Sequence, residues 1–169
     1  MKTVLTMELS KKSLEEAKKF LNRYRDAYSK GVDNAVKYAT EVLYNKVLEY
    51  CYAEGISEHT SQINWSYDKN TKVGRVWTND MVIIFNEMGT GIVGSNSPHP
   101  SPNSQFKSWQ YDVNEHGEKG WKYPKSDGTF GWTRGLPSRH MFFSAFEDIK
   151  AEIGSIVDVE IRKTVGDLY

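Results

Sequence analysis

The first third of the chain repeats apolar residues at steps of three and four positions, the spacing of one helix face. Ser13-x-x-Glu16 forms a capping box at the start of the first stripe, and a second stripe follows Gly31. We expect either a helical hairpin or one long helix bent at Gly31, ending near Gly55, after a short strand over residues 2–9. The stripes are Leu14, Ala17, Leu21, Tyr24 and Tyr28, then Val32, Val36, Ala39, Leu43, Val47 and Tyr50.

Alternation of apolar and polar residues replaces the helical spacing beyond Ser57. Ile63, Trp65 and Tyr67 alternate with polar residues, residues 68–71 have turn composition, and residues 72–78 run back as a second strand. This pattern predicts a β-hairpin. The apolar run that follows predicts a third strand over residues 81–87, central in a sheet because its apolar residues are consecutive.

Residues 89–135 differ in composition from the rest of the chain, since they hold four of the five prolines and three of the five tryptophans. Residues 95–104 have loop composition. Residues 121–123 and 129–134 can pair as a hairpin around a turn at 124–128. Because so many aromatic rings argue against disorder, we expect a β-arm inserted at about residues 92–134.

The chain ends in a stripe of apolar residues spaced almost wholly at four positions, which predicts a helix. The alternation over residues 157–161 leaves a late strand as an alternative. The expected fold class is α+β in a single domain, 1–169, with an N-terminal helical region, a small antiparallel or mixed sheet, the β-arm, and a C-terminal helix packed on the sheet. The stripe is Phe142, Phe146, Ile149, Ile153, Val157, Ile161 and Val165.

Composition excludes several classes of function. The 22 basic and 22 acidic residues balance, so no overall charge attracts the chain to nucleic acid or an anionic membrane. Cys51 is the only cysteine, which rules out an intrachain disulfide and a thiolate zinc site; we expect a buried helical thiol. The N-terminus lacks the features of a signal peptide, so we expect synthesis in a cytoplasm. No stretch of the sequence approaches a membrane span, which needs about 20 apolar residues, so we expect no membrane partner.

The glycines at 89, 91 and 94 have the spacing of a dinucleotide-binding turn. Such a turn needs a helix after its third glycine, to face the pyrophosphate. Prolines 98, 100 and 102 oppose a helix there, so we expect no nucleotide or other cofactor. The glycines instead let the backbone turn sharply out of a strand into a loop.

Two motifs around this loop carry a family resemblance. Glu87-Met88-Gly89-Thr90-Gly91 resembles the "(V/I)-E-x-G-T-G" motif that ends a strand in the tail-completion, or head-to-tail joining, proteins of long-tailed phages. Residues 135–146 are similar to that family's "G-Q-P-A-R-P-F-L-x-P-A-L", which opens its last helix. The order of elements agrees along nearly the whole chain, and the aromatic hairpin resembles a variant from phages of Gram-positive hosts. The chain departs from the motifs at Asn86, His140 and Ser144.

The resemblance implies structural roles for the motif residues. Glu87 would accept backbone N–H groups of the turn or pair with Arg139, Thr90 would tie down the turn, and Ser138 can cap the last helix. The glycines would adopt positive φ, and the aromatic residues would fix the helix on the sheet. The structural set is Glu87, Gly89, Thr90, Gly91, Gly135, Arg139, Phe142 and Ala145.

The resemblance also implies a non-enzymatic virion protein at the head–tail junction, made in the host cytoplasm. Its subunits would form a ring, expected to be a hexamer, that contacts other neck and tail proteins, and its basic first helix could face DNA in a lumen. Rings need contacts between different faces of one subunit, and aromatic residues on an arm suit such contacts. The expected interface residues are Trp109, Trp121, Tyr123, Phe130 and Trp132.

Three other functions compete with this one. A tail terminator also forms rings and shares a small α+β layout. A glycan-binding module would use the arm's aromatic rings, although the long helical stripes do not suit a β-sandwich. An enzyme would need a His–carboxylate unit or paired carboxylates in a cleft. The four histidines, 59, 99, 116 and 140, are scattered without ligand spacing, so we expect surface or interface histidines, no catalytic residue and no metal.

Overall fold

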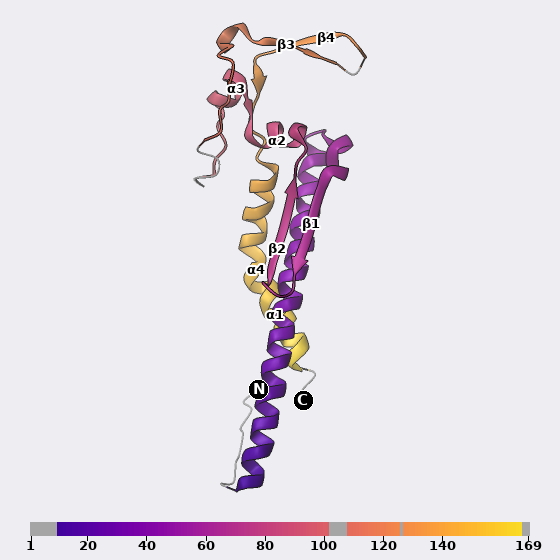
Figure 1. Cartoon of the computed structure of the whole chain (residues 1–169), viewed down its shortest axis with the longest axis vertical. Coiled ribbons are helices and arrows are strands. Elements are labelled where there is room, and N and C mark those ends of the chain that lie inside the picture. Colours follow the sequence, from indigo (N-terminus) through magenta and orange to yellow (C-terminus); the bar gives the residue numbers. More distant parts are fainter. Residues whose placement is uncertain (1–9, 102–107, 126, 167–169) are drawn as a thin grey trace. The chain divides into compact units, whose positions relative to one another are not determined.

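The structure, a computed structural model, describes residues 10–101, 108–125 and 127–166 (Figure 1). The α+β class is confirmed, whereas the expected strand at 2–9 lies outside the described residues. The elements are α1 (Lys11–Ala53), η1 (Ser57–Gln62), β1 (Ile63–Asp68), β2 (Val73–Thr78), α2 (Met81–Met88), α3 (Gly91–Asn96), η2 (Gly117–Lys119), β3 (Trp121–Pro124), β4 (Phe130–Thr133), β5 (Gly135–Leu136) and α4 (Met141–Gly166).

The chain divides into two compact units. The described residues of unit 1 fall within 10–39, 67–74 and 152–166, and unit 2 comprises residues 40–66 and 75–151 except those outside the described ranges. The long helices and the first hairpin each contribute residues to both units. That all these residues form a single domain stays a prediction.

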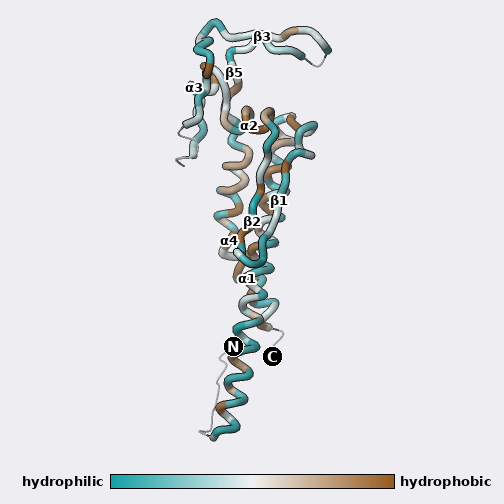
Figure 2. Tube along the Cα trace, viewed as in Figure 1, coloured by the Kyte–Doolittle hydropathy of each residue, from teal (hydrophilic) through white to brown (hydrophobic). Residues whose placement is uncertain are grey.

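Gly31 allows two helices in unit 1 to approach closely. α1 runs through this position as one helix, so the helical-hairpin alternative is wrong. Gly31 is buried, and a Cβ there would lie 2.5 Å from Thr164 Oγ1 and 2.8 Å from Ile161 Cα of α4. Only a residue without a side chain fits between these backbones. Figure 2 shows the helix around and before this point as largely hydrophilic, with isolated apolar positions.

The predicted hairpin at 63–78 is confirmed as β1 and β2. Its turn is closed by Asp68, whose Oδ1 accepts the Asn70 N–H at 2.8 Å and whose Oδ2 accepts the Thr71 hydroxyl at 2.8 Å. Next to the turn in unit 1, Asp33 of α1 pairs with Lys72 and accepts the Tyr67 hydroxyl at 2.9 Å. These polar contacts fix the turn end of the hairpin against α1.

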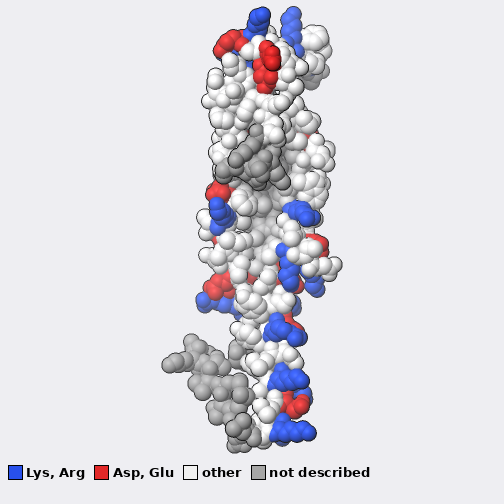
Figure 3. All heavy atoms as spheres, turned by 60° about the vertical axis from the view of Figure 1, so that its left-hand side comes forward, with Lys and Arg blue, Asp and Glu red and all other residues white. Residues whose placement is uncertain are grey.

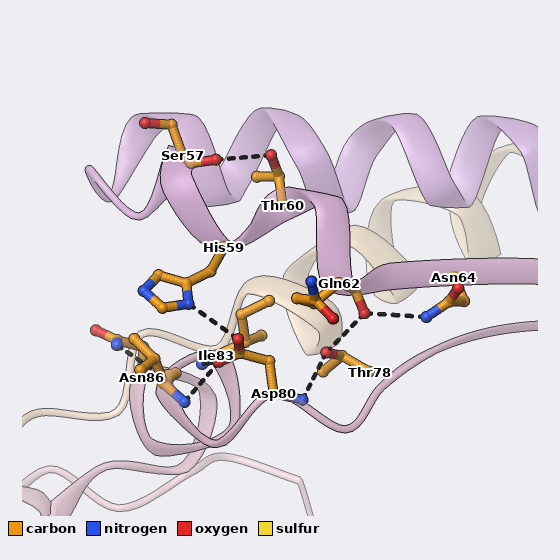
Figure 4. Close-up of polar contacts among 10 residues, drawn as sticks. Ser57, His59, Thr60, Gln62, Asn64, Thr78, Asp80, Ile83 and Asn86 are labelled. Atoms are coloured by element: carbon orange, nitrogen blue, oxygen red, sulfur yellow. Dashed lines mark hydrogen bonds and ion pairs between the residues drawn. The ribbon is translucent and has the colours of Figure 1, made fainter.

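The strand predicted at 81–87 is wrong, because these residues form helix α2. Asp80 caps the helix: its Oδ1 accepts the backbone N–H groups of Val82 at 2.7 Å and Ile83 at 3.2 Å. His59 Nδ1 lies 2.9 Å from Asp80 Oδ2, and the Thr78 hydroxyl accepts the Asp80 N–H, as Figure 4 shows. A good local cap therefore outweighs the strand propensity of the apolar run. The signal was present in the sequence as an Asp directly before that run.

The core of unit 2 draws on two helical regions, the hairpin and α2. The expectation of a buried helical thiol is confirmed: Cys51 is fully buried, and burial raises its pKa to about 11, with a further contribution from the charge of Glu87. The start of α4 contributes Met141 and Ala145, which pack with β1, so the C-terminal helix lies on the sheet as expected. The buried cluster is Val47, Cys51, Ile63, Ile83, Met141 and Ala145.

The predicted C-terminal helix is present. The insertion expected at about residues 92–134 is a β-arm only within residues 121–133; the glycines lead into helix α3 and not directly into the expected loop. α4 is continuous to Gly166, so the alternative of a late strand at 157–161 is wrong. The arm is the antiparallel pair β3–β4, with Trp121 opposite Thr133 and Pro124 opposite Phe130. Figure 1 shows it in orange, extending beyond α3 within unit 2.

We expect Gly31→Ala to destabilise the protein and Gly154→Ala to stabilise it. Both glycines are helical, so each alanine should gain up to about 1 kcal/mol of helix propensity. A Cβ at position 154 meets nothing within 4 Å, whereas one at position 31 collides with α4 backbone, and overpacking costs about 1–3 kcal/mol. Urea unfolding followed by circular dichroism measures both; equal shifts would contradict the close helix contact.

We expect Asp80→Ala to cost about 0.5–2 kcal/mol at pH 7, the usual loss for a helix cap. Burial opposes ionisation of Asp80, but the bonds from His59, Ile83 and Val82 lower its pKa overall. Because the pKa of Asp80 is lower in the folded protein, its ionised carboxylate stabilises the fold at pH values above about 3.9, the pKa in the unfolded chain. This stabilisation is lost as the pH falls through the pKa of the folded state. The difference in unfolding free energy between wild type and variant should therefore narrow below about pH 4. Asp26→Ala, at an exposed acid, is the control and should change stability by less than about 0.5 kcal/mol.

Candidate functional site

The two sequence motifs pair directly with each other in unit 2. Thr90 bridges Leu136 and Gly91 bridges Gly135 in antiparallel fashion, and the Thr90 hydroxyl accepts the Leu136 N–H at 3.2 Å. Gly89, Gly91 and Gly135 have φ of 81°, 60° and 110°, the left-handed region that favours glycine. A Cβ on Gly135 would lie 1.9 Å from the Thr90 carbonyl oxygen. The expected roles of Thr90 and of the glycines at 89 and 91 in shaping the turn are confirmed, and the structure adds Gly135 to them.

Glu87 caps helix α4 from a distant part of the sequence. Its Oε2 accepts the Phe142 N–H at 2.8 Å and its Oε1 accepts the Phe143 N–H at 3.0 Å. Its backbone carbonyl accepts the Ser138 hydroxyl at 2.6 Å. A carboxylate at a helix N-terminus satisfies free N–H groups and interacts favourably with the helix dipole. Glu87 thus joins α2, the turn before α4 and α4 itself.

The expected pairing of Glu87 with Arg139 is wrong. The Arg139 guanidinium contacts Glu54 instead, with Nη1 at 3.0 Å from Glu54 Oε2. The Arg139 backbone N–H bonds the Asn86 carbonyl oxygen at 2.8 Å, which keeps the two motifs in contact through the main chain. The expectation that Ser138 caps α4 is also wrong, since its hydroxyl donates to Glu87 and the helix begins only at Met141. The distant carboxylate takes over the capping position.

His99 is a site residue that the sequence did not reveal. Its side chain is only 2% exposed, and its Nε2 lies 3.0 Å from Glu87 Oε1. Its Nδ1 accepts the Ser101 N–H at 3.1 Å, so the proton sits on Nε2 and points at the carboxylate. The expectation of a surface or interface histidine is therefore wrong for His99. The surrounding prolines correctly indicate a loop, but the sequence does not show that this loop is folded over Glu87.

A groove of about 1030 Å³ lies beside the paired motifs within unit 2. Its walls are the exposed side of α2, residues 108–116, the base of the arm and β5. Trp109 is fixed in the wall because its Nε1 donates to the Gly89 carbonyl oxygen at 2.9 Å and its ring lies 6.2 Å from that of Phe85. The groove surface is predominantly apolar, with several aromatic rings.

The five expected interface residues divide into two groups. Trp109 and Trp121 pack within their own unit, Trp121 with its ring 4.9 Å from that of His116. The other three project from the arm: Tyr123 is 41% exposed, Phe130 69% and Trp132 58%. These three are the more exposed, but Tyr123 and Trp132 also line the groove of their own unit, so Phe130 is the residue of the five that projects farthest from such contacts.

Asp112 and His116 form a His–carboxylate pair in the groove, and this pair has a structural role in its loop. Asp112 accepts the Gly117 and His116 N–H groups at 2.7 and 3.0 Å and lies 3.1 Å from His116 Nδ1. The Gly117 bond, followed by the His116 bonds, lowers the pKa of Asp112. Within the described ranges, no group of three His, Cys, Asp or Glu side chains is arranged to hold a metal ion.

No protein-family model, curated protein or solved structure matches this chain. No helix in the part of the chain that the structure describes is long and apolar enough to cross a membrane. Membership of the tail-completion family, first indicated by the motifs, stays a prediction.

We expect Glu87→Gln and Glu87→Ala each to cost about 1.5–3 kcal/mol, because hydrogen bonds to a buried charge are the strong ones. Glutamine keeps the size of the side chain but presents an amide NH₂ to groups that are themselves donors. Thermal unfolding measures the loss. Glu152→Gln, at an exposed site on α4, is the control; a Glu87→Gln variant as stable as this control would contradict the capping role.

Proposed function

We propose that this chain is a non-enzymatic subunit of a ring at the head–tail junction of a long-tailed phage or prophage. In this role it completes the tail or joins it to the head, together with other neck and tail proteins. The proposal rests on the motif resemblance and on the geometry of the paired motifs.

The observation that carries the proposal is the contact between Gly89–Gly91 and Gly135–Leu136. These segments are more than 40 residues apart, and their backbones meet at glycines where a Cβ has no room. This contact, called the glycine joint below, thus requires the glycines, Thr90 and the preceding Glu87. It gives a physical reason for both motifs. In this proposal the contact holds the arm and α4 in place for assembly.

The exposed arm supports an assembly role. Monomeric proteins rarely expose large contiguous apolar surface, and aromatic residues commonly anchor interfaces. The first half of α1 carries the basic residues that would face DNA in a lumen, and Figure 3 shows lysine and arginine side chains recurring along this part, with fewer acidic ones between them. Because the whole chain has no net charge, DNA contact is a secondary part of the proposal.

A tail terminator is the alternative ring protein, and the aromatic groove keeps a glycan-binding role as a more distant second candidate. The side chains of Gln110 and Asn114 line the groove beside Trp109 and Trp121, a combination of amides and rings that can bind sugars. A change in tryptophan fluorescence on adding oligosaccharides would favour this candidate.

The proposal predicts a specific assembly defect in a phage whose gene for this chain carries an early stop codon. Electron microscopy of the lysate should show DNA-filled heads beside free tails of normal length. Overlong tails would move the assignment to a tail terminator. Normal infectious particles would overturn both ring functions. Suppression of the stop codon in a permissive host is the matched control and should restore joined particles.

A further inference from the structure

We propose that the tip of the arm of one copy packs into the aromatic groove of the next copy. The tip comprises Pro124, Lys125 and Asp127–Phe130, with Phe130 as its anchor. This contact would be head to tail, since the tip and the groove are different faces of the same subunit. The inference deepens the proposed ring function and rests on it for the closure of the ring.

The arm needs a partner because it is small and exposes its largest side chains. Its strands are only four residues long each, and a two-stranded hairpin is marginally stable by itself. Its base is held within the unit, where Trp132 Nε1 donates to the Lys119 carbonyl oxygen at 3.0 Å. Its tip has no such support: Phe130 is 69% exposed, the most exposed aromatic ring among the described residues.

The groove offers an apolar surface that matches this tip. On its α2 side, Met81 is 52% exposed and Phe85 38%; on its arm side, Trp132 is 58% exposed. Asp112, the acid inside the groove, is already bonded by His116 and Gly117. An aromatic anchor that enters this groove therefore displaces water from the aromatic rings and from the Met81 thioether. It leaves no carboxylate without a partner, because Asp112 is already bonded.

The charges of the two surfaces favour a second copy as the occupant. At the tip, Lys125 is exposed, whereas Asp127 already accepts the N–H and the hydroxyl of Thr129. In the groove wall formed by residues 108–114 and 116, Asp112 carries an acidic side chain, and the exposed Glu115 lies beside it. The cation of the tip is thus complementary to the acids at the wall. Glu115 lies between two groove-lining residues and Lys125 lies at the tip, so these two form the expected intersubunit pair. Figure 3 shows charged side chains of both signs gathered around the arm end of unit 2.

The buried area favours a closed ring over a pair. A tip in a groove covers two or three large apolar side chains on each subunit, on the order of 300–500 Å² a side. This lies below the about 800 Å² per partner of a standard interface, so two subunits alone would associate weakly. In a closed ring each subunit makes two such contacts, so a subunit is lost only when both break, which stabilises the ring relative to a pair.

Cysteine cross-linking tests the contact even where it is weak. One preparation carries Phe130→Cys and another Met81→Cys; both positions are exposed, so folding should be preserved and is checked by circular dichroism. Mixing the two under mild oxidation should give a disulfide-linked dimer at least tenfold above either preparation alone. A chain with both cysteines should give a ladder of oligomers. The wild-type chain, with only the buried Cys51, and a mixture of Phe130→Cys with Lys150→Cys on α4 are the controls.

Three outcomes would overturn the proposal. The first is the absence of a cross-link both in this mixture and in one where the exposed Thr129→Cys, which keeps the Phe130 anchor, replaces Phe130→Cys. The others are a cross-link of Phe130→Cys with itself as efficient as the mixed one, and an equal yield with Lys150→Cys. The charge pairing is tested in the same assay: Lys125→Glu on the arm donor should lower the yield severalfold, and Glu115→Lys on the groove donor should restore it. Failure of this rescue would overturn the assigned register.

The cross-linking experiment and the stop-codon experiment can fail independently of each other. Free heads and tails in the stop-codon lysate, without cross-linking at these positions, would retain the phage role and move the interface elsewhere. Efficient cross-linking with normal phage particles would retain the self-association and reject the proposed function.

Discussion

The carboxylate of Glu87 at the N-terminus of α4 is the interaction on which unit 2 depends. It is nearly buried, and its two oxygens accept two backbone N–H groups of the helix and contact the imidazole of His99. Leaving those donors without a partner in a buried setting would be costly. The end of α2, the start of α4 and the loop around His99 are therefore held to one another through a single side chain.

The glycine joint follows from this anchor. Once Glu87 and Ser138 are bonded, the chain on either side brings Thr90 and Gly135 within bridging distance. The backbones then approach so closely that side chains at the glycine positions would collide. Trp109 donates its indole N–H to the Gly89 carbonyl oxygen, so the joint also positions one wall of the groove. The groove wall is thus fixed both by this polar contact and by its ring contacts, Trp109 with Phe85 and Trp121 with His116.

Rigid support and exposed apolar surface are combined in the arm region. Its base is bonded to the body of unit 2 through Trp132 and the Arg134–Glu118 pair at 2.7 Å, whereas Phe130 at its tip remains exposed. A supported arm with a free aromatic tip loses little conformational freedom on binding, which favours association. This gives a physical link between the local structure and the proposed assembly role.

The sequence by itself determined the elements whose signals are local. The stripes of α1 and α4, the Asp68 turn and the β3–β4 hairpin follow from spacing and turn chemistry and were predicted.

Only the tertiary structure decided the contacts between distant residues. It made Gly31 a helix-packing site instead of a break and joined Arg139 to Glu54 instead of Glu87. It also buried His99 against a carboxylate. The α2 helix lies between these cases: its cap was visible at Asp80, but the partners that hold it, such as His59, come from elsewhere in the chain. Periodicity reports which face of an element is apolar, whereas the partner of a polar side chain depends on which segments the fold brings within about 3 Å.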